Sequence, residues 1–526
     1  MSKPFIILFL CLQVFASVRA QTVFSKTYGD DAYQNGSALQ LLPDGGMVIA
    51  GTTGFDQTDS ADIALYRMNA DGDLLWSVKA GGPVSDYVNN MILTHDQGTI
   101  LTGQSIVNDP DSAIGALFVI KLDSLGNAEW AQSYDRPGIE SGNAIRELAN
   151  GDFLIAGSTS SPDSMPNGLL LKIDALGNLL WTKRFELNRS VLFTSLELSP
   201  TGSTGEFFVG GTAIDSLHDP NGDFVVLKLD SSGQLLWQFL AGGSGLDIVN
   251  ALTPLTNGGL YGCGTTNSGP SMNEDDGVLF KLDSLGNAEW VHHYNRTNDE
   301  GFMDLKFDQN RQEVYLCGST TTSGSGPLPL ILVTDDSGTV LQSRKQQAVF
   351  AEAFCTNLQL TDNGLLLTGQ ADFADALLVR TDRNGNSPVC QDSIILLTAD
   401  SLPLTGVGLL TTQSFSLTPA ALNWTSQPFV DQFSTLCFTN STSDVKEDPL
   451  LIFPNPSSTW LQARSSFDHI TEWVVYSMTG EKLMTGKLQQ QEQVLTIGLS
   501  TLANGVYLLE LNSDDGVQRA HFIRQE

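Results

Sequence analysis

The sequence is short of positive charge. Its 526 residues include 27 lysines and arginines against 59 aspartates and glutamates, a formal net charge of -32 at pH 7. A surface that binds nucleic acid must be basic in order to release counterions from phosphates. The composition therefore argues against DNA, RNA and anionic membranes as partners. After the first twenty residues no apolar run is long enough to span a bilayer, so we expect no transmembrane segment.

Histidine is scarce, and its placement indicates no catalytic or metal site. The six histidines show no i, i+4 spacing, and none lies in a motif with a nucleophilic serine or cysteine. No catalytic or cofactor-binding residue can be named, and we favour a role without catalysis. Residues 69–73 and 219–223 gather oxygen atoms as calcium loops do, although turns use the same residue types. Calcium is kept as a candidate cofactor, and no other is indicated.

Cysteine is also rare, with six in the chain. Five remain if the N-terminal segment that holds Cys11 is removed, and an odd number cannot all pair internally. Cys390 and Cys437 bracket a segment rich in Ser, Thr and Leu, so we predict a disulfide between them. Cys263 and Cys317 occupy a repeat position that elsewhere holds small residues. We expect these two thiols, and that of Cys355, to be buried by packing.

The first twenty residues have the features of a signal peptide. Lys3 supplies positive charge, residues 5–15 are apolar, and Val18 and Ala20 are the small residues that a signal peptidase reads. We expect the mature protein to begin at Gln21 and to be secreted or attached to the outer cell surface.

A unit of about fifty residues is repeated seven times and fixes the predicted architecture. Each copy has an apolar strand that ends in glycine, and these glycines follow one another at steps of 52, 54, 54, 53, 54 and 51 residues: Gly51, Gly103, Gly157, Gly211, Gly264, Gly318 and Gly369. We call them the landmark glycines. Each copy also has strand patterns separated by Gly, Asn or Asp turns. This periodicity predicts an all-β fold with a seven-bladed β-propeller over residues 21–389.

The first strand of the mature chain predicts how the ring closes. Residues 22–29 match the strand that follows the turn in every other repeat, whereas the last repeat breaks off after its turn. We expect residues 22–29 to complete the last blade beside residues 376–381 and to leave no free sheet edge.

A second recurring feature is a turn followed by tryptophan. The cleanest copies read KLDSLGNAEW at 121–130 and 281–290, and the tryptophans are Trp76, Trp130, Trp181, Trp237 and Trp290. The motif resembles the tryptophan-docking motif of quinoprotein-like propellers. That resemblance implies a structural role for these tryptophans, in packing between blades.

The last eighty residues resemble the type A sorting domain of proteins exported by the type IX secretion system of Bacteroidetes-type bacteria. The matching residues are Pro454, Asn455 and Pro456 after a short strand, Gly480 in a turn, and Gly505 and Tyr507 before the terminal strands. The resemblance implies a small β-sandwich of immunoglobulin type over residues 448–526 and the secretion machinery as a partner. Residues 390–447 are then a connector clamped by the predicted disulfide.

Acidic residues recur at one phase of the repeat. Counting seventeen residues back from the landmark glycine gives Asp86, Glu140, Asp247 and Glu352, and Glu300 is one residue off in a fifth copy. These positions precede the second strand of the unit, which we expect to be innermost. One interpretation is a solvated loop in a very acidic protein, and the other is a ring that binds a cation or cationic ligand at the channel mouth.

The function that these patterns favour is an extracellular or surface-attached binding scaffold with an unknown ligand, either a glycan or a protein. The alternatives are a secreted enzyme that acts on polysaccharide or protein, and a repetitive adhesive surface component. Fold alone does not choose among them.

Overall fold

The computed structural model describes most of the chain between residues 23 and 524. The described ranges are 23–29, 33–54, 61–81, 84–109, 112–161, 165–187, 189–201, 205–214, 221–269, 274–295, 299–322, 325–346, 352–371, 375–386, 393–394, 397–401, 405–406, 411–414, 418–421, 426–428, 432–439, 451–453, 459–464, 471–477, 482–487, 494–503, 505–513 and 516–524. All elements within these ranges are β-strands. The chain divides into two compact units, Met1–Asn440 and Ser441–Glu526.

Within its described residues, the first unit contains seven groups of four antiparallel strands, here called blades 1 to 7. Blade 1 consists of β2 (Ala38–Leu41), β3 (Met47–Thr53), β4 (Asp62–Met68) and β5 (Leu74–Ala80). Blade 2 consists of β6 (Ser85–Leu93), β7 (Thr99–Asp109), β8 (Ser112–Leu122) and β9 (Ala128–Asp135). Blade 3 consists of β10 (Ile139–Glu147), β11 (Phe153–Ser160), β12 (Asn167–Ile173) and β13 (Leu179–Glu186). Blade 4 consists of β14 (Ser190–Leu198), β15 (Phe207–Ile214), β16 (Gly222–Leu229) and β17 (Leu235–Gly242). Blade 5 consists of β18 (Asp247–Pro254), β19 (Leu260–Thr266), β20 (Asp276–Leu282) and β21 (Ala288–Asn295). Blade 6 consists of β22 (Glu300–Asp308), β23 (Glu313–Thr322), β24 (Ser325–Asp335) and β25 (Val340–Lys345). Blade 7 consists of β26 (Ala353–Leu360), β27 (Gly364–Ala371), β28 (Asp375–Asp382) and β1 (Val23–Gly29).

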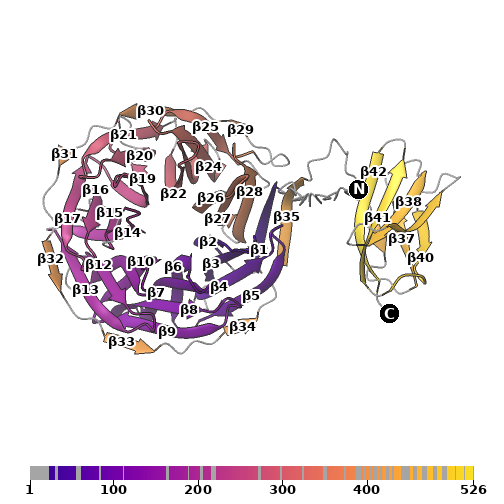
Figure 1. Ribbon diagram of the computed structural model, residues 1–526, viewed down its shortest axis with the longest axis horizontal. Helices are drawn as coiled ribbons and strands as arrows, with labels where there is room; N and C mark the ends of the chain where they lie inside the picture. Colours follow the sequence, from indigo (N-terminus) through magenta and orange to yellow (C-terminus); the bar gives the residue numbers. More distant parts are fainter. Residues whose placement is uncertain are drawn as a thin grey trace, which may run out of the picture. The chain divides into compact units, whose positions relative to one another are not determined.

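The blades are arranged in a ring (Figure 1), and the predicted all-β propeller is confirmed. The first strand of each blade is innermost, and each inner strand contacts the inner strand of the next blade, with β26 meeting β2 to complete the circle. Because each blade presents apolar side chains on both faces, the core lies between neighbouring blades. One such cluster joins Phe185 of blade 3 with Phe193 and Val209 of blade 4.

The N-terminal strand closes the ring as the sequence predicted. β1 pairs antiparallel with β28, and Phe24 lies opposite Arg380 while Tyr28 lies opposite Ala376. Its other edge pairs with β35 (Gln432–Thr439). The N-terminal strand is therefore hydrogen-bonded on both sides.

The tryptophans dock against the turn of the following blade. Gly126 of blade 2 has a φ of 86°, and a Cβ at this position would lie 2.6 Å from the ring of Trp76 in blade 1. Gly177 and Trp130 repeat the arrangement between blades 3 and 2. Only a residue without a Cβ allows this approach at a positive φ, which explains why the turn keeps a glycine.

Seven strands between residues 393 and 439 line the outer edges of the blades, and we call these strands the belt. They are β29 (Ser393–Ile394), β30 (Thr398–Ser401), β31 (Thr405–Gly406), β32 (Thr411–Ser414), β33 (Thr418–Ala421), β34 (Ser426–Pro428) and β35. In this order they pair antiparallel with the outermost strands of blades 6, 5, 4, 3, 2, 1 and 7. The chain thus runs back around the ring and adds a fifth strand to every blade, which covers the exposed sheet edges.

The belt changes the predicted domain organisation. The sequence presents residues 390–447 as a separate connector, but the compact unit of the propeller extends to Asn440. Apart from β35, the belt strands are two to four residues long. Strands of this length are too short to show a period-two pattern, so they could not be predicted from the sequence.

The second unit has two sheets with the orders β36-β37-β40 and β39-β38-β41-β42. Their bounds are β36 (Leu451–Phe453), β37 (Trp460–Arg464), β38 (Glu472–Ser477), β39 (Lys482–Lys487), β40 (Val494–Gly498), β41 (Gly505–Ser513) and β42 (Gly516–Arg524). Side chains of both sheets, including Leu461, Val475 and Phe522, share one core. This arrangement agrees with the predicted small β-sandwich.

Candidate functional site

A β-bulge recurs at one position of six inner strands, directly after the residue that lies opposite the landmark glycine. The bulged residues are Asn89, Asn143, Thr194, Asn250, Met303 and Thr356. A bulge turns a side chain away from the regular pleat. Here it directs the side chain along the channel wall toward the next blade.

Five of the bulged residues donate a hydrogen bond to a backbone carbonyl of the next blade, and we call this set the bulge ring. The bonds run from Asn89 Nδ2 to Gly142 O (3.0 Å), Asn143 Nδ2 to Phe193 O (2.7 Å), Thr194 Oγ1 to Val249 O, Asn250 Nδ2 to Phe302 O (2.8 Å) and Thr356 Oγ1 to Gly36 O (2.7 Å). Each bond joins two blades, so the ring ties the propeller together around its axis. Met303 has no N–H or O–H to donate.

The next residue of the inner strand makes a second tier of contacts between blades. Asn90 Oδ1 accepts a bond from Ile145 N at 3.2 Å, and Ser195 Oγ accepts one from Leu252 N at 3.2 Å. Asp304 Oδ2 accepts a bond from Leu358 N at 2.9 Å. Each of these contacts joins two neighbouring blades through a backbone donor.

The inner strands enclose a cavity of about 670 Å³ at the centre of the ring. Every blade contributes to its lining, through residues such as Gln40, Asn89, Arg146, Glu197 and Lys306. The volume is in the range of sites that hold small ligands. Most of the lining residues carry amide, hydroxyl or charged side chains, and apolar residues such as Val88, Met91 and Leu196 lie among them, so the wall offers both polar and apolar contacts.

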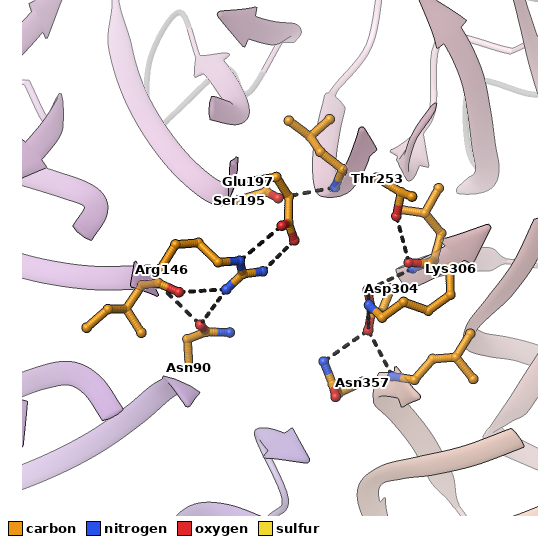
Figure 2. A network of polar contacts seen from close by, with 12 residues as sticks. Asn90, Arg146, Ser195, Glu197, Thr253, Asp304, Lys306 and Asn357 are labelled. Atoms are coloured by element: carbon orange, nitrogen blue, oxygen red, sulfur yellow. Dashed lines mark hydrogen bonds and ion pairs between the residues drawn. The ribbon is translucent and has the colours of Figure 1, made fainter. Parts of the chain in front are cut away.

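An arginine and a glutamate from neighbouring blades form an ion pair in this cavity (Figure 2). Arg146 of β10 donates from Nε to Glu197 Oε2 at 3.0 Å and from Nη2 to Glu197 Oε1. Its Nη1 donates to Ile145 O at 2.6 Å. Burial alone would lower the pKa of Arg146, but the charge of Glu197 outweighs it and raises that pKa. Arg146 therefore stays charged, and each side chain of the pair is 24% exposed.

A lysine and an aspartate form a second pair on the opposite wall (Figure 2). Lys306 Nζ donates to both carboxylate oxygens of Asp304, at 2.9 and 3.0 Å. Asp304 Oδ2 also accepts a bond from Asn357 Nδ2 at 3.0 Å. Burial would lower the pKa of Lys306, but Asp304 and Glu197 together raise it. The charges of Arg146, Glu197, Asp304 and Lys306 sum to zero, and Glu147, which also lines the cavity and pairs with His95, adds one further carboxylate.

The acidic residues that precede the landmark glycines by seventeen positions do not meet at a channel mouth. Asp86, Glu140 and Asp247 lie at the start of inner strands, as expected, but they are buried within their own blades. Each accepts a bond from a hydroxyl directly opposite on the second strand: Ser105 to Asp86, Thr159 to Glu140 at 2.8 Å, and Thr266 to Asp247. Glu300 and Thr320 form the same contact at 2.7 Å. Glu352 is half-buried and packs against Gly326 of blade 6.

Burial raises the pKa of Glu140, although Thr159 and Arg136 oppose it. It also raises the pKa of Asp247, against hydrogen bonds from Thr266, Gly243 and Ser268. In the described part of the chain, no three side chains of His, Cys, Asp or Glu come close enough to share a metal ion. The structure thus does not bring the four selected carboxylates together as a cation site.

The first candidate calcium loop has the contacts of the other turns, and the second is described only in residues 221–223. Asn69 Oδ1 accepts bonds from the amides of Asp71 and Asp73, which is the contact that Asp123 makes in the turn of blade 2. In the second loop, Asp223 pairs with Arg189. Asp219 lies outside the described residues.

Two further sets of sequence-selected residues can be placed only in part. Cys263, Cys317 and Cys355 are fully buried, as expected, and burial raises the pKa of each thiol. Cys437 lies in β35 opposite Ser25, but its side chain and the whole of Cys390 are outside the described residues, so the disulfide stays a prediction. In the second unit, Pro454, Asn455, Pro456 and Gly480 lie outside the described residues.

The two remaining residues of the sorting motif are structural. Gly505 begins β41 opposite Arg524. Tyr507 is buried, stacks near Phe522 with ring centroids 5.6 Å apart, and donates from its hydroxyl to Ala503 O at 2.8 Å. These contacts fix the last hairpin of the sandwich.

Comparisons with known proteins identify the second unit. Residues 451–525 match the family model of the secretion system C-terminal sorting domain. The comparison with curated proteins gave no match. Among the described residues, no helix has the length and apolar character needed to cross a membrane.

Solved structures resemble the chain only distantly. One is PorZ of Porphyromonas gingivalis, described as an essential surface component of the type IX secretion system, with 12% identity over 92% of this chain and 58% of that chain and a TM-score of 0.39. Another is the polysaccharide lyase Uly1, with 12% identity over 66% of this chain and 90% of that chain and a TM-score of 0.38. A third is an α-L-arabinanase of Penicillium chrysogenum, with 12% identity over 69% of this chain and 98% of that chain and a TM-score of 0.39.

These structural likenesses are too weak to bear on function. The family match and the fold together lead to a coarser conclusion. This chain is a β-propeller protein with a sorting domain in residues 451–525, exported through the type IX secretion system to the cell surface or the extracellular space.

Proposed function

We propose that the exported propeller is a binding scaffold whose ligand enters the central channel. The observation that carries the proposal is the cavity of about 670 Å³, which all seven inner strands line with polar groups. The wall is held by bonds between blades, so the site is formed before a ligand arrives. A preformed polar cavity binds without a large ordering cost.

The rival function is an enzyme that acts on extracellular polysaccharide or protein. Three carboxylates, Glu147, Glu197 and Asp304, line the same cavity, which is the feature that favours it. Each contacts a basic side chain: Glu147 contacts His95, Glu197 contacts Arg146 and Asp304 contacts Lys306. A general acid or base must reach the bond that it helps to break, whereas these carboxylates are directed at partners in the wall. The geometry therefore supports binding better than hydrolysis.

A single experiment separates these functions. The mature full-length chain is titrated with soluble polysaccharides and with peptide mixtures in a calorimeter, and each mixture is then analysed for cleavage products by mass spectrometry. The proposal expects a saturable heat of binding and intact polymers. Cleavage products would favour the enzyme, and the absence of saturable binding to any probe would overturn the scaffold.

A further inference from the structure

The bulge ring lacks a donor at two blades: the described strand β2 of blade 1 has no bulge, and in blade 6 the bulged residue is Met303. Its side chain lines the cavity and is 40% exposed. The amide of Asn250 in blade 5 contacts its sulfur at 3.5 Å. Since methionine cannot donate a hydrogen bond, this part of the wall offers an apolar surface within an otherwise polar ring. A ligand that meets it needs an apolar face as well as polar groups.

Lys306 retains a hydrogen-bond donor beside this surface. An ammonium has three N–H groups, and the described bonds of Lys306 Nζ go to the two oxygens of Asp304. The side chain is 29% exposed. One N–H can therefore reach a ligand while the pair with Asp304 stays intact.

Glu197 provides the matching acceptor. Each carboxylate oxygen accepts one bond from Arg146, and a carboxylate offers about four acceptor positions in all. Glu197 lines the same cavity as Lys306, and its charge acts on Lys306 across it. The two walls thus present an open acceptor and an open donor to one ligand.

The chemistry of these groups selects the class of ligand. A hydroxyl group both donates and accepts, so it can bond to Glu197 and to Lys306 without breaking either ion pair. Breaking a partly buried pair is costly, because it leaves a charge without a partner. A charged ligand group would compete with Arg146 for Glu197 or with Asp304 for Lys306, whereas a hydroxyl adds a bond and leaves both pairs in place. The net charge of -32 also repels acidic polymers.

We propose that the channel binds a neutral carbohydrate, with sugar hydroxyls bonded to Glu197 and Lys306 and the C–H face of the sugar packed on Met303. This inference rests on the proposed binding function and makes it specific. A sugar ring has the required combination, since hydroxyls surround its edge and C–H groups form its faces.

The test uses the mature full-length chain and three kinds of probe: neutral glucans and mannans, the acidic polymer polygalacturonate, and casein peptides. Calorimetry measures the Kd of each for the wild type and for the variants Lys306→Met and Met303→Ala. The control is Thr253→Val, which removes the bond from Thr253 Oγ1 to Leu305 O between blades 5 and 6. Thr253 does not contribute to the cavity lining, so this change costs packing between blades without touching the proposed site.

We expect a neutral polysaccharide to bind, and Lys306→Met to raise its Kd about tenfold, as the loss of one bond to a charged group does. Met303→Ala should raise Kd by a smaller factor, and Thr253→Val should leave it unchanged. Because Met303→Ala keeps every ion pair, it still tests the site if the Lys306 variant misfolds. Neutral-sugar binding that neither cavity variant weakens would overturn the inference and leave the scaffold standing. Preference for the acidic polymer or for peptides would overturn the ligand class, and no binding at all would overturn both proposals.

Discussion

Phe24 packs against Gly72 as Trp76 packs against Gly126. A Cβ on Gly72 would lie 2.7 Å from the ring of Phe24, and one on Gly126 would lie 2.6 Å from the ring of Trp76. Phe24 belongs to β1, so the N-terminal strand supplies the docking aromatic of blade 7 to blade 1. Closure of the ring thus uses the packing that joins the other blades, in addition to the strand pairs of β1.

The first prediction concerns this closure. Replacement of the fully buried Phe24 by alanine should lower the free energy of unfolding by about 3–5 kcal/mol, and deletion of residues 21–29 should cost more, of the order of a domain's net stability. Calorimetric unfolding measures both. Leu125→Ala is the control, because Leu125 is 74% exposed. A melting temperature that the deletion leaves unchanged would contradict this mode of closure.

The second prediction concerns the bulge ring. Asn143→Ala removes the donor to Phe193 O and leaves a carbonyl between blades without its partner. The expected cost is about 1–3 kcal/mol in the free energy of unfolding. Chemical denaturation of the variant gives the value, with the exposed Asn310→Ala as a control. Equal stability of the two variants would mean that the ring contributes little.

The third prediction concerns the buried carboxylates and pH. Burial raises the pKa of Asp247 in the folded state, so its contribution to stability is greatest below the unfolded pKa of about 3.9 and is lost as pH rises through the folded value. The stability of Asp247→Asn relative to the wild type should therefore increase as the pH is raised from about 3 to about 7. Melting temperatures across this range provide the measurement.

Asp123→Asn is the matched control, because the effect of pH on its stability relative to the wild type should have the opposite sign. Hydrogen bonds from Asn127, Leu125 and Gly126 hold the pKa of Asp123 low, so its contribution is present above the unfolded pKa and is lost as pH falls through the folded value. This variant should be destabilised at neutral pH and approach the wild type in acid. Parallel pH profiles for the two variants would contradict the assigned environments.

The fourth prediction concerns export. A chain that ends at Asp448 keeps the propeller and the belt but lacks the sorting domain of residues 451–525. In the native host it should fold and accumulate in the periplasm, where cell fractionation detects it. Its normal appearance at the cell surface would refute the sorting role of the second unit.

The repeat could be read from the sequence because each blade is a local unit whose strands follow one another along the chain. The periodicity of the repeat predicted the landmark glycines, the docking tryptophans and the closing strand. The belt could not be predicted, because a strand such as β31, with two residues, takes its structure from the edge of β17 rather than from its own pattern.

The candidate site was harder to predict than the fold. The sequence correctly predicted that Asp86, Glu140 and Asp247 lie at the start of inner strands. It did not predict that their side chains point into their own blades instead of toward a channel mouth. A signal was present: Ser105, Thr159 and Thr266 each follow a landmark glycine by two residues and place a hydroxyl opposite the carboxylate. Arg146, Glu197 and Lys306 had no such signal, because each occurs once among the blades.

The central claim is that the channel of the exported propeller is its binding site, and one comparison tests it most directly. The cavity variant carries Arg146→Gln and Glu197→Gln, which remove an ion pair inside the cavity. The outer variant carries Arg184→Gln and Glu186→Gln, which remove an ion pair of nearly equal exposure on β13, the fourth strand of blade 3. Affinity for the polysaccharide bound by the wild type is measured by calorimetry on all three proteins. The account predicts that the cavity variant loses at least tenfold in affinity while the outer variant binds like the wild type. Equal affinity of the two variants would contradict it.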